Sequence, residues 1–132
     1  MKNLLEKINT LSKKRIKFYE KNNWDNWFYK WSETFFEQIS LELQEVLDEN
    51  KLNNSIYLED ELWDVLWCYL NLLHSLKNEW KITSVKKVFE RSYKKFTWRI
   101  EEETWENNWK WNEIKKSQKE ELKKENDLIY KK

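Results

Sequence analysis

Apolar residues recur every three or four positions through most of the chain, which is the spacing of one face of an α-helix. This pattern predicts five helices, over residues 2–19, 28–47, 56–77, 84–100 and 112–130. Polar, asparagine-rich stretches separate these segments, and none of them alternates apolar and polar residues as a strand does. The predicted fold class is therefore all-α.

Local signals set the boundaries of the predicted helices. The apolar stripe that begins at Phe28 continues past Ser32, and we expect no break there. The asparagines at 53–54 predict a turn before the third helix, and the Thr83-Ser84 dipeptide offers a cap for the fourth. Residues 101–111 are acidic, asparagine-rich and aperiodic, so we expect a loop before the charged, amphipathic last helix.

Acidic residues lie beside the apolar stripes of the second and third predicted helices. Glu61 and Asp64 are three residues apart within the run Glu59–Trp67, so they share one helix face. Glu42 and Glu45 repeat this spacing on the preceding helix. Two antiparallel helices joined by a short loop would bring the two pairs toward each other.

Four converging carboxylates repel one another unless a cation neutralises them. Carboxylate oxygens, with no His or Cys at matching spacing, select Mg²⁺ or Mn²⁺ over zinc. Magnesium held in this way takes further ligands from a substrate phosphate, and a water that the metal polarises can attack phosphorus. The competing interpretation is a solvated helix face, because 24 acids among 132 residues produce such pairs freely.

Charge and cysteine content argue against several classes of partner. The net charge is +1 with basic and acidic residues mixed throughout, so we expect no nucleic-acid partner and no membrane partner. No apolar run approaches a membrane span, and the first residues lack the apolar core of a signal peptide. The single cysteine, Cys68, fits a reducing compartment. We predict a cytoplasmic protein in which Cys68, one turn beyond Asp64, is a small buried thiol rather than part of the site, and His74 is packed or partly exposed rather than catalytic.

The content of tryptophan and glycine is abnormal. The chain has no Gly and 10 Trp, whereas average usage of roughly 7% would give about nine glycines. Trp24, Trp27 and Trp109 each follow an asparagine, where a turn would ordinarily place glycine. One hypothesis is that a reassigned codon inserts Gly at many of these positions. Codon bias toward AT explains the abundant Lys, Asn and Ile, but it does not explain abundant Trp.

The acidic residues carry a resemblance to a known family. The pattern Glu42-x-x-Glu45, fifteen residues, then Glu61-x-x-Asp64 resembles the signature of the all-α NTP pyrophosphohydrolases. This is the MazG-like superfamily, which also includes dimeric dUTPases. The run Glu61–Trp67 is similar to the family's Glu-Leu-Gly-Asp-Val-Leu-Trp type of sequence.

The resemblance extends into the fourth predicted helix and implies a fold. The segment Lys86–Arg99 resembles the family's next helix, which ends in a Lys … Arg pattern, and the match covers roughly residues 31–100. It implies a MazG-like helical bundle with a four-helix core and an additional charged C-terminal helix, in which residues 28–100 form the MazG-like pyrophosphohydrolase core. An N-terminal helix and loop (1–27) would precede this core, and a loop and charged amphipathic helix (101–132) would follow it within a single domain.

The resemblance also implies an activity: Mg²⁺-dependent hydrolysis of a nucleoside triphosphate to the monophosphate and pyrophosphate, with a role in nucleotide-pool house-cleaning. Mn²⁺ is the alternative metal. Lys95 and Arg99 would contact the substrate phosphates, and the chain would form a homodimer or homotetramer. The residues expected to serve as metal ligands and catalytic groups are Glu42, Glu45, Glu61 and Asp64.

One position departs from the family's pattern, and one alternative function stays open. Trp63 stands where the family usually has glycine, and a tryptophan there could crowd the site. If residue 63 is a reassigned glycine, the motif is intact. The alternative function is a non-enzymatic, all-helical protein-interaction module that uses its charged amphipathic helices.

Overall fold

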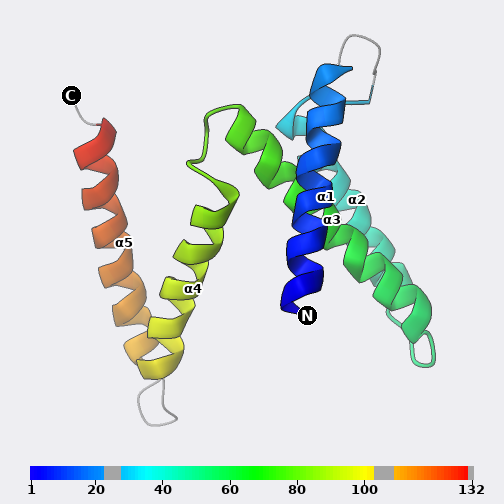
Figure 1. Ribbon diagram of the computed structural model, residues 1–132. Coiled ribbons are helices and arrows are strands. Elements are labelled where there is room, and N and C mark those ends of the chain that lie inside the picture. The colour runs from blue at the N-terminus through cyan, green and yellow to red at the C-terminus, as the bar shows by residue number, and fades with distance from the viewer. Residues whose placement is uncertain (23–27, 103–108, 131–132) are drawn as a thin grey trace. The chain divides into compact units, whose positions relative to one another are not determined.

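The computed structural model describes residues 1–22, 28–102 and 109–130 (Figure 1). Over these residues the chain is helical and contains no strand, so the all-α prediction is confirmed. No described helix combines the length and hydropathy that a membrane span requires. Residues group into two compact units, 1–85 and 86–132. The helices are α1 (Lys2–Lys21), α2 (Ser32–Glu49), α3 (Ser55–Asn78), α4 (Val85–Glu102) and α5 (Trp109–Tyr130).

In the first unit, α3 packs against both α1 and α2. The apolar core lies where these helices meet. It consists of residues from α1, α2, α3 and the segment before α2, with Tyr19, Ile39 and Leu76 packed around it. The central side chains are Ile16, Tyr29, Phe35 and Leu72.

Buried polar side chains pair across the interface between α1 and α3. The Ser12 hydroxyl donates to Oδ1 of Asn71 over 2.6 Å, and both residues are buried. Nε2 of His74 lies 2.8 Å from Oδ1 of Asn9. Burial lowers the pKa of His74, which favours the neutral ring. These pairs satisfy groups that would be costly to bury alone, and the predicted packed role of His74 is confirmed.

The second helix begins at Ser32, so the prediction of a continuous helix from Phe28 is wrong. Trp31, the residue before α2, has φ 60° and ψ −145°, which no helix allows. The Lys30 N–H donates to Oγ1 of Thr34 over 2.6 Å, and that hydroxyl donates to the Phe28 carbonyl over 3.2 Å. The apolar stripe persists because this non-helical segment also packs: Tyr29 is buried within the core.

A short loop joins α2 and α3 into an antiparallel hairpin. Asn53 has φ 59°, so the predicted asparagine turn is confirmed. The side-chain amide of Asn54 donates to the main-chain carbonyl of Glu49 over 2.8 Å and to its carboxylate over 2.6 Å. These bonds tie the residue before α3 to the last residue of α2 across the short loop.

The second unit is also a helical hairpin. Arg91 on α4 forms a two-bond ion pair with Glu125 on α5, and Arg99 donates to Gln118 over 2.8 Å. The order of these pairs shows that α4 and α5 run antiparallel. Helix α5 begins at Trp109 rather than at the predicted Asn112, and the part of the predicted loop at 103–108 lies outside the described residues.

Candidate metal centre

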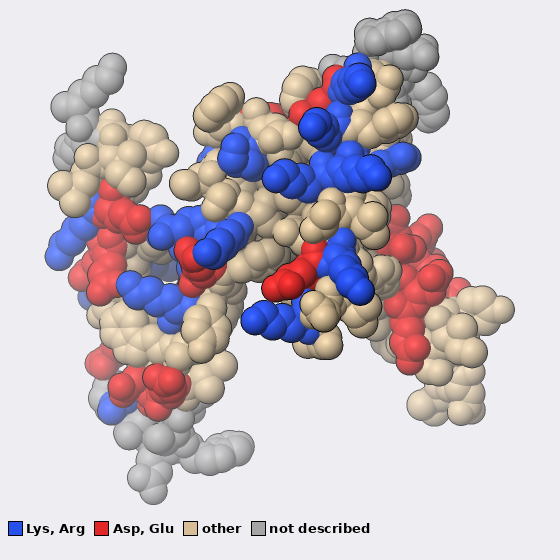
Figure 2. Space-filling model, viewed as in Figure 1, with Lys and Arg blue, Asp and Glu red and all other residues tan. Residues whose placement is uncertain are grey.

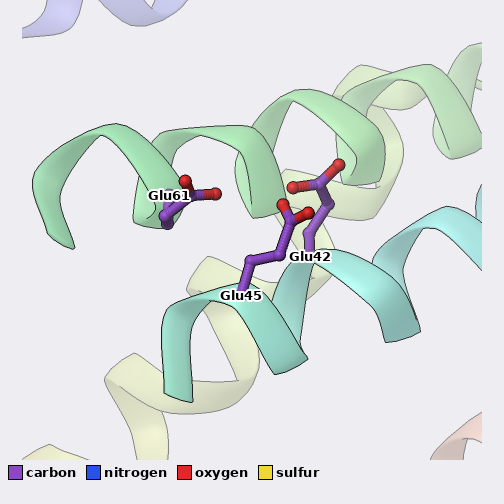
Figure 3. A group of neighbouring side chains, drawn as sticks. All are labelled: Glu42, Glu45 and Glu61. Carbon is purple, nitrogen blue, oxygen red and sulfur yellow. The ribbon is translucent and has the colours of Figure 1, made fainter. Parts of the chain in front are cut away.

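Acidic side chains gather over the α2–α3 hairpin of the first unit, whereas basic side chains gather over α1 (Figure 2). Within the hairpin, Glu42 and Glu45 rise from α2 toward α3, and Glu61 approaches from α3 (Figure 3). Each offers one carboxylate oxygen, and these three oxygens lie within 4.8 Å of one another. The structure therefore brings three of the four predicted ligand residues into one cluster.

Helix geometry and the hairpin together explain this convergence. Residues three apart project from the same helix face, so α2 presents Glu42 and Glu45 together. Asp64 lies one turn beyond Glu61 on α3, outside the group of three. It is within electrostatic reach of that group, since its charge contributes to the raised pKa of Glu42.

The surroundings of the cluster make the carboxyl groups of Glu42, Glu61 and Asp64 harder to ionise. Burial, the neighbouring Glu45 carboxyl, and the charges of Asp64 and Glu61 raise the pKa of Glu42 from 4.5 to about 7. Burial, then the charge of Glu45, raises the pKa of Glu61. The pKa of Asp64 is raised by burial and by the charges of Asp60 and Glu45. Shifts of this kind mark a site where negative charge is not compensated.

Two oxygen atoms of the cluster are buried without a hydrogen-bond partner among the described residues: Oε2 of Glu42 and Oε2 of Glu61. A buried, unpaired carboxylate oxygen is expensive, and native proteins rarely keep one without a proton or a cation. The donor set consists of hard oxygens, which suits Mg²⁺ or Mn²⁺. The residues present thus fit a divalent metal ion.

Cys68 and Trp63 lie near the acidic residues of α3 in the sequence. Cys68 is buried, and burial followed by the charges of Glu42, Asp64 and Glu45 raises its pKa to about 11. The thiol is therefore protonated at pH 7, which makes it a poor nucleophile. Trp63 is 40% exposed beside Asp64, so its indole is only partly packed.

Lys95 and Arg99, the predicted phosphate contacts, belong to the second unit. Arg99 is buried, its Nε donates to Gln118, and its guanidinium lies 5.2 Å from the centre of the Trp111 ring. Gln118 in turn donates to the main-chain carbonyl of Lys95 over 3.0 Å. Arg99 thus links α4 to α5, and its contact with phosphate stays a prediction.

Sequence reasoning gave no role to Asp60, although it lies in the same acidic run. Its charge is the largest charge effect on the raised pKa of Asp64. The four-residue spacing from Asp60 to Asp64, one helical turn, was the available signal. Asp60 therefore adds negative charge at the edge of the cluster.

The fold and the site define an all-helical protein whose central hairpin carries a carboxylate cluster suited to a hard cation. The family model of the MazG nucleotide pyrophosphohydrolase domain matches residues 31–104, which span α2, α3 and α4. This is more than half of the chain, and the chain belongs to this family. No curated protein and no solved structure matches the chain significantly.

Proposed function

We propose that the protein hydrolyses a nucleoside triphosphate to the monophosphate and pyrophosphate with the help of a divalent metal ion. The observation that carries the proposal is the convergence of the Glu42, Glu45 and Glu61 carboxylates within 4.8 Å in a member of the MazG family. A bare cluster of this kind is self-repelling. A divalent cation held by these carboxylates would relieve the repulsion and would supply positive charge for a substrate phosphate.

The metal ligands in this proposal are Glu42, Glu45, Glu61 and Asp64, and the ion is Mg²⁺, with Mn²⁺ as the substitute. The bound ion would polarise phosphate oxygens and lower the pKa of a bound water. The buried Oε2 atoms of Glu42 and Glu61, which have no hydrogen-bond partner among the described residues, would serve as oxygen donors to the ion. The carboxylate of Glu45 belongs to a residue exposed to solvent, where substrate arrives.

The chain's own groups have definite tasks in this reaction. A water oxygen bonds to the α-phosphorus, the bond from that phosphorus to the bridging oxygen breaks, and pyrophosphate leaves. We assign the orientation of the attacking water to Glu45, because its exposed carboxylate can pass a proton to solvent. Lys95 and Arg99 are the proposed cations that neutralise the leaving pyrophosphate.

A panel of nucleotides tests the proposal and identifies the substrate. The purified chain is incubated with each standard and damaged nucleoside triphosphate, with Mg²⁺ or with EDTA, and pyrophosphate is measured. We expect at least one triphosphate to yield pyrophosphate and monophosphate in equal amounts, only with metal. Release of inorganic phosphate together with a nucleoside diphosphate would contradict the reaction proposed.

Apolar side chains on the outer faces of α2 and α3 bear on assembly. Leu43, Leu47 and Leu62 are each at least half exposed, which leaves apolar surface without cover in one chain. We propose that a second copy covers it in a homodimer, or three copies in a homotetramer, within the cytoplasm. Light scattering coupled to size-exclusion chromatography should show the mass of two or four chains.

The same apolar surface is what favours the alternative, a non-enzymatic interaction module. Isothermal titration with Mg²⁺ separates the two functions. An enzyme of the proposed kind binds the ion through Glu45, so Glu45→Gln should weaken binding, while Glu37→Gln, exposed on the same helix, should not. A module would show no carboxylate-dependent metal binding.

A further inference from the structure

Two tryptophans occupy backbone conformations that favour glycine. Among the described residues that are not glycine, positive φ occurs at Trp31 (60°), Asn53 (59°) and Trp80 (64°). Asparagine tolerates this left-handed region, because its short polar side chain bonds locally. Tryptophan has no such tolerance, since its Cβ and ring crowd the following carbonyl.

Trp80 stands at the position of a helix terminus where glycine is most common. After the last residues of α3, the Trp80 N–H donates to the Lys77 carbonyl over 3.1 Å and the Lys81 N–H donates to the Leu76 carbonyl over 3.0 Å. This pair of bonds is the Schellman motif, whose left-handed residue is usually glycine. The Trp80 side chain is 89% exposed, so packing does not compensate for its backbone.

The backbone conformation of Trp31 is even less favourable for a tryptophan than that of Trp80. Its φ of 60° combined with ψ of −145° lies close to a region that is populated almost only by glycine. The bond from the Lys30 N–H to the Thr34 hydroxyl holds the chain in this conformation at the start of α2. Trp31 is 40% exposed, and its ring centre lies 5.6 Å from that of Tyr29 in a tilted aromatic contact.

We propose that residues 31 and 80 are glycine in the native protein, because the codon rendered as Trp at these positions is decoded as Gly. The composition is independent support: the chain has 10 Trp and no Gly. The same decoding applies wherever that codon recurs. If it encodes residue 63, glycine rather than tryptophan immediately precedes Asp64 in α3.

Mass spectrometry of the protein purified from the cells that encode it tests the proposal directly. Lysyl endopeptidase cuts after Lys30 and Lys51, which releases a peptide that begins at residue 31. We expect the mass of this peptide, and of one that spans residue 80, to correspond to glycine. Masses that correspond to tryptophan would overturn the proposal. This test needs no catalytic activity, so its failure is distinct from failure of the proposed function.

Variants of the recombinant tryptophan-containing chain test the backbone argument separately. Trp80→Gly should raise the folding equilibrium constant roughly tenfold, because glycine adopts the left-handed conformation without steric cost. The matched control is Trp80→Ala, which removes the same ring but keeps a Cβ, and it should give little of this gain. Equal effects of the two substitutions, or a loss of stability with glycine, would overturn the argument.

Discussion

Replacing Glu42 with glutamine removes one negative charge from the carboxylate cluster and keeps the side-chain shape. Unit charges 4.8 Å apart repel by about 1 kcal/mol in water and by about 3.5 kcal/mol at an effective dielectric constant of about 20. Glu42 is only half-buried, so solvent screening favours the lower figure. We expect Glu42→Gln to raise the free energy of unfolding of the metal-free protein by about 1 kcal/mol.

Magnesium should reverse the order of stability, so that the wild type becomes more stable than Glu42→Gln. A ligand that binds only the folded state at ten times its dissociation constant stabilises it by about 1.4 kcal/mol, and the variant lacks one ligand for the ion. The assay is urea unfolding followed by circular dichroism, in EDTA and in Mg²⁺, near pH 8, where Glu42 is ionised.

The control variant is Glu37→Gln, which removes an exposed charge from α2 outside the cluster and should respond to Mg²⁺ as the wild type does. The reasoning is refuted if Glu42→Gln is less stable than the wild type in EDTA, or if Mg²⁺ stabilises both chains equally.

Three further predictions concern pH and the buried polar contacts. The pKa of Glu42 is raised from 4.5 to about 7 in the folded state, so between these pH values the folded protein binds a proton that the unfolded chain has lost. The free energy of unfolding of the metal-free protein should therefore fall as pH rises from about 4.5 to about 7. Melting temperatures measured across this pH range should fall less steeply for Glu42→Gln than for the wild type. Asn71→Ala leaves the buried Ser12 hydroxyl without its partner and should cost about 1–3 kcal/mol in urea unfolding, and a double-mutant cycle with Ser12→Ala that shows no coupling would contradict the pairing. Arg99→Lys loses the bond to Gln118 and should lower the local stability of α5 by about 1.5–3 kcal/mol, seen as faster hydrogen exchange there with α1 to α3 unchanged.

Periodicity predicted the long helices well and their irregular starts badly. The third helix was expected over residues 56–77 and spans Ser55–Asn78, because a long, regular apolar stripe leaves few alternatives. The start of α2 could not be predicted, since Tyr29 reaches the core from non-helical backbone and Trp31 breaks the helix with a positive φ. Apolar periodicity indicates which residues face the core, but it does not indicate the backbone conformation at those residues.

For the candidate site, too, the sequence predicts some features and not others. The spacing of the acids correctly predicted that Glu42 and Glu45 lie near Glu61, because two helices joined by a short loop can pack in few ways. Spacing could not show which carboxylate oxygens are buried or that Cys68 is kept protonated, because both depend on side chains from different helices. The burial of Arg99 against α5 is likewise a tertiary contact between residues far apart in the sequence.

The most direct test of the account is the rate of pyrophosphate release from the best triphosphate in Mg²⁺, compared between the wild type and Glu61→Gln. Glu61 contributes an unpaired buried oxygen to the cluster, so the account predicts a rate at least 100-fold lower in the variant, on the order of the loss from removing one fixed electrostatic group. Glu37→Gln should release pyrophosphate as the wild type does. Release by Glu61→Gln at the wild-type rate would contradict the assignment of the carboxylate cluster as the active site.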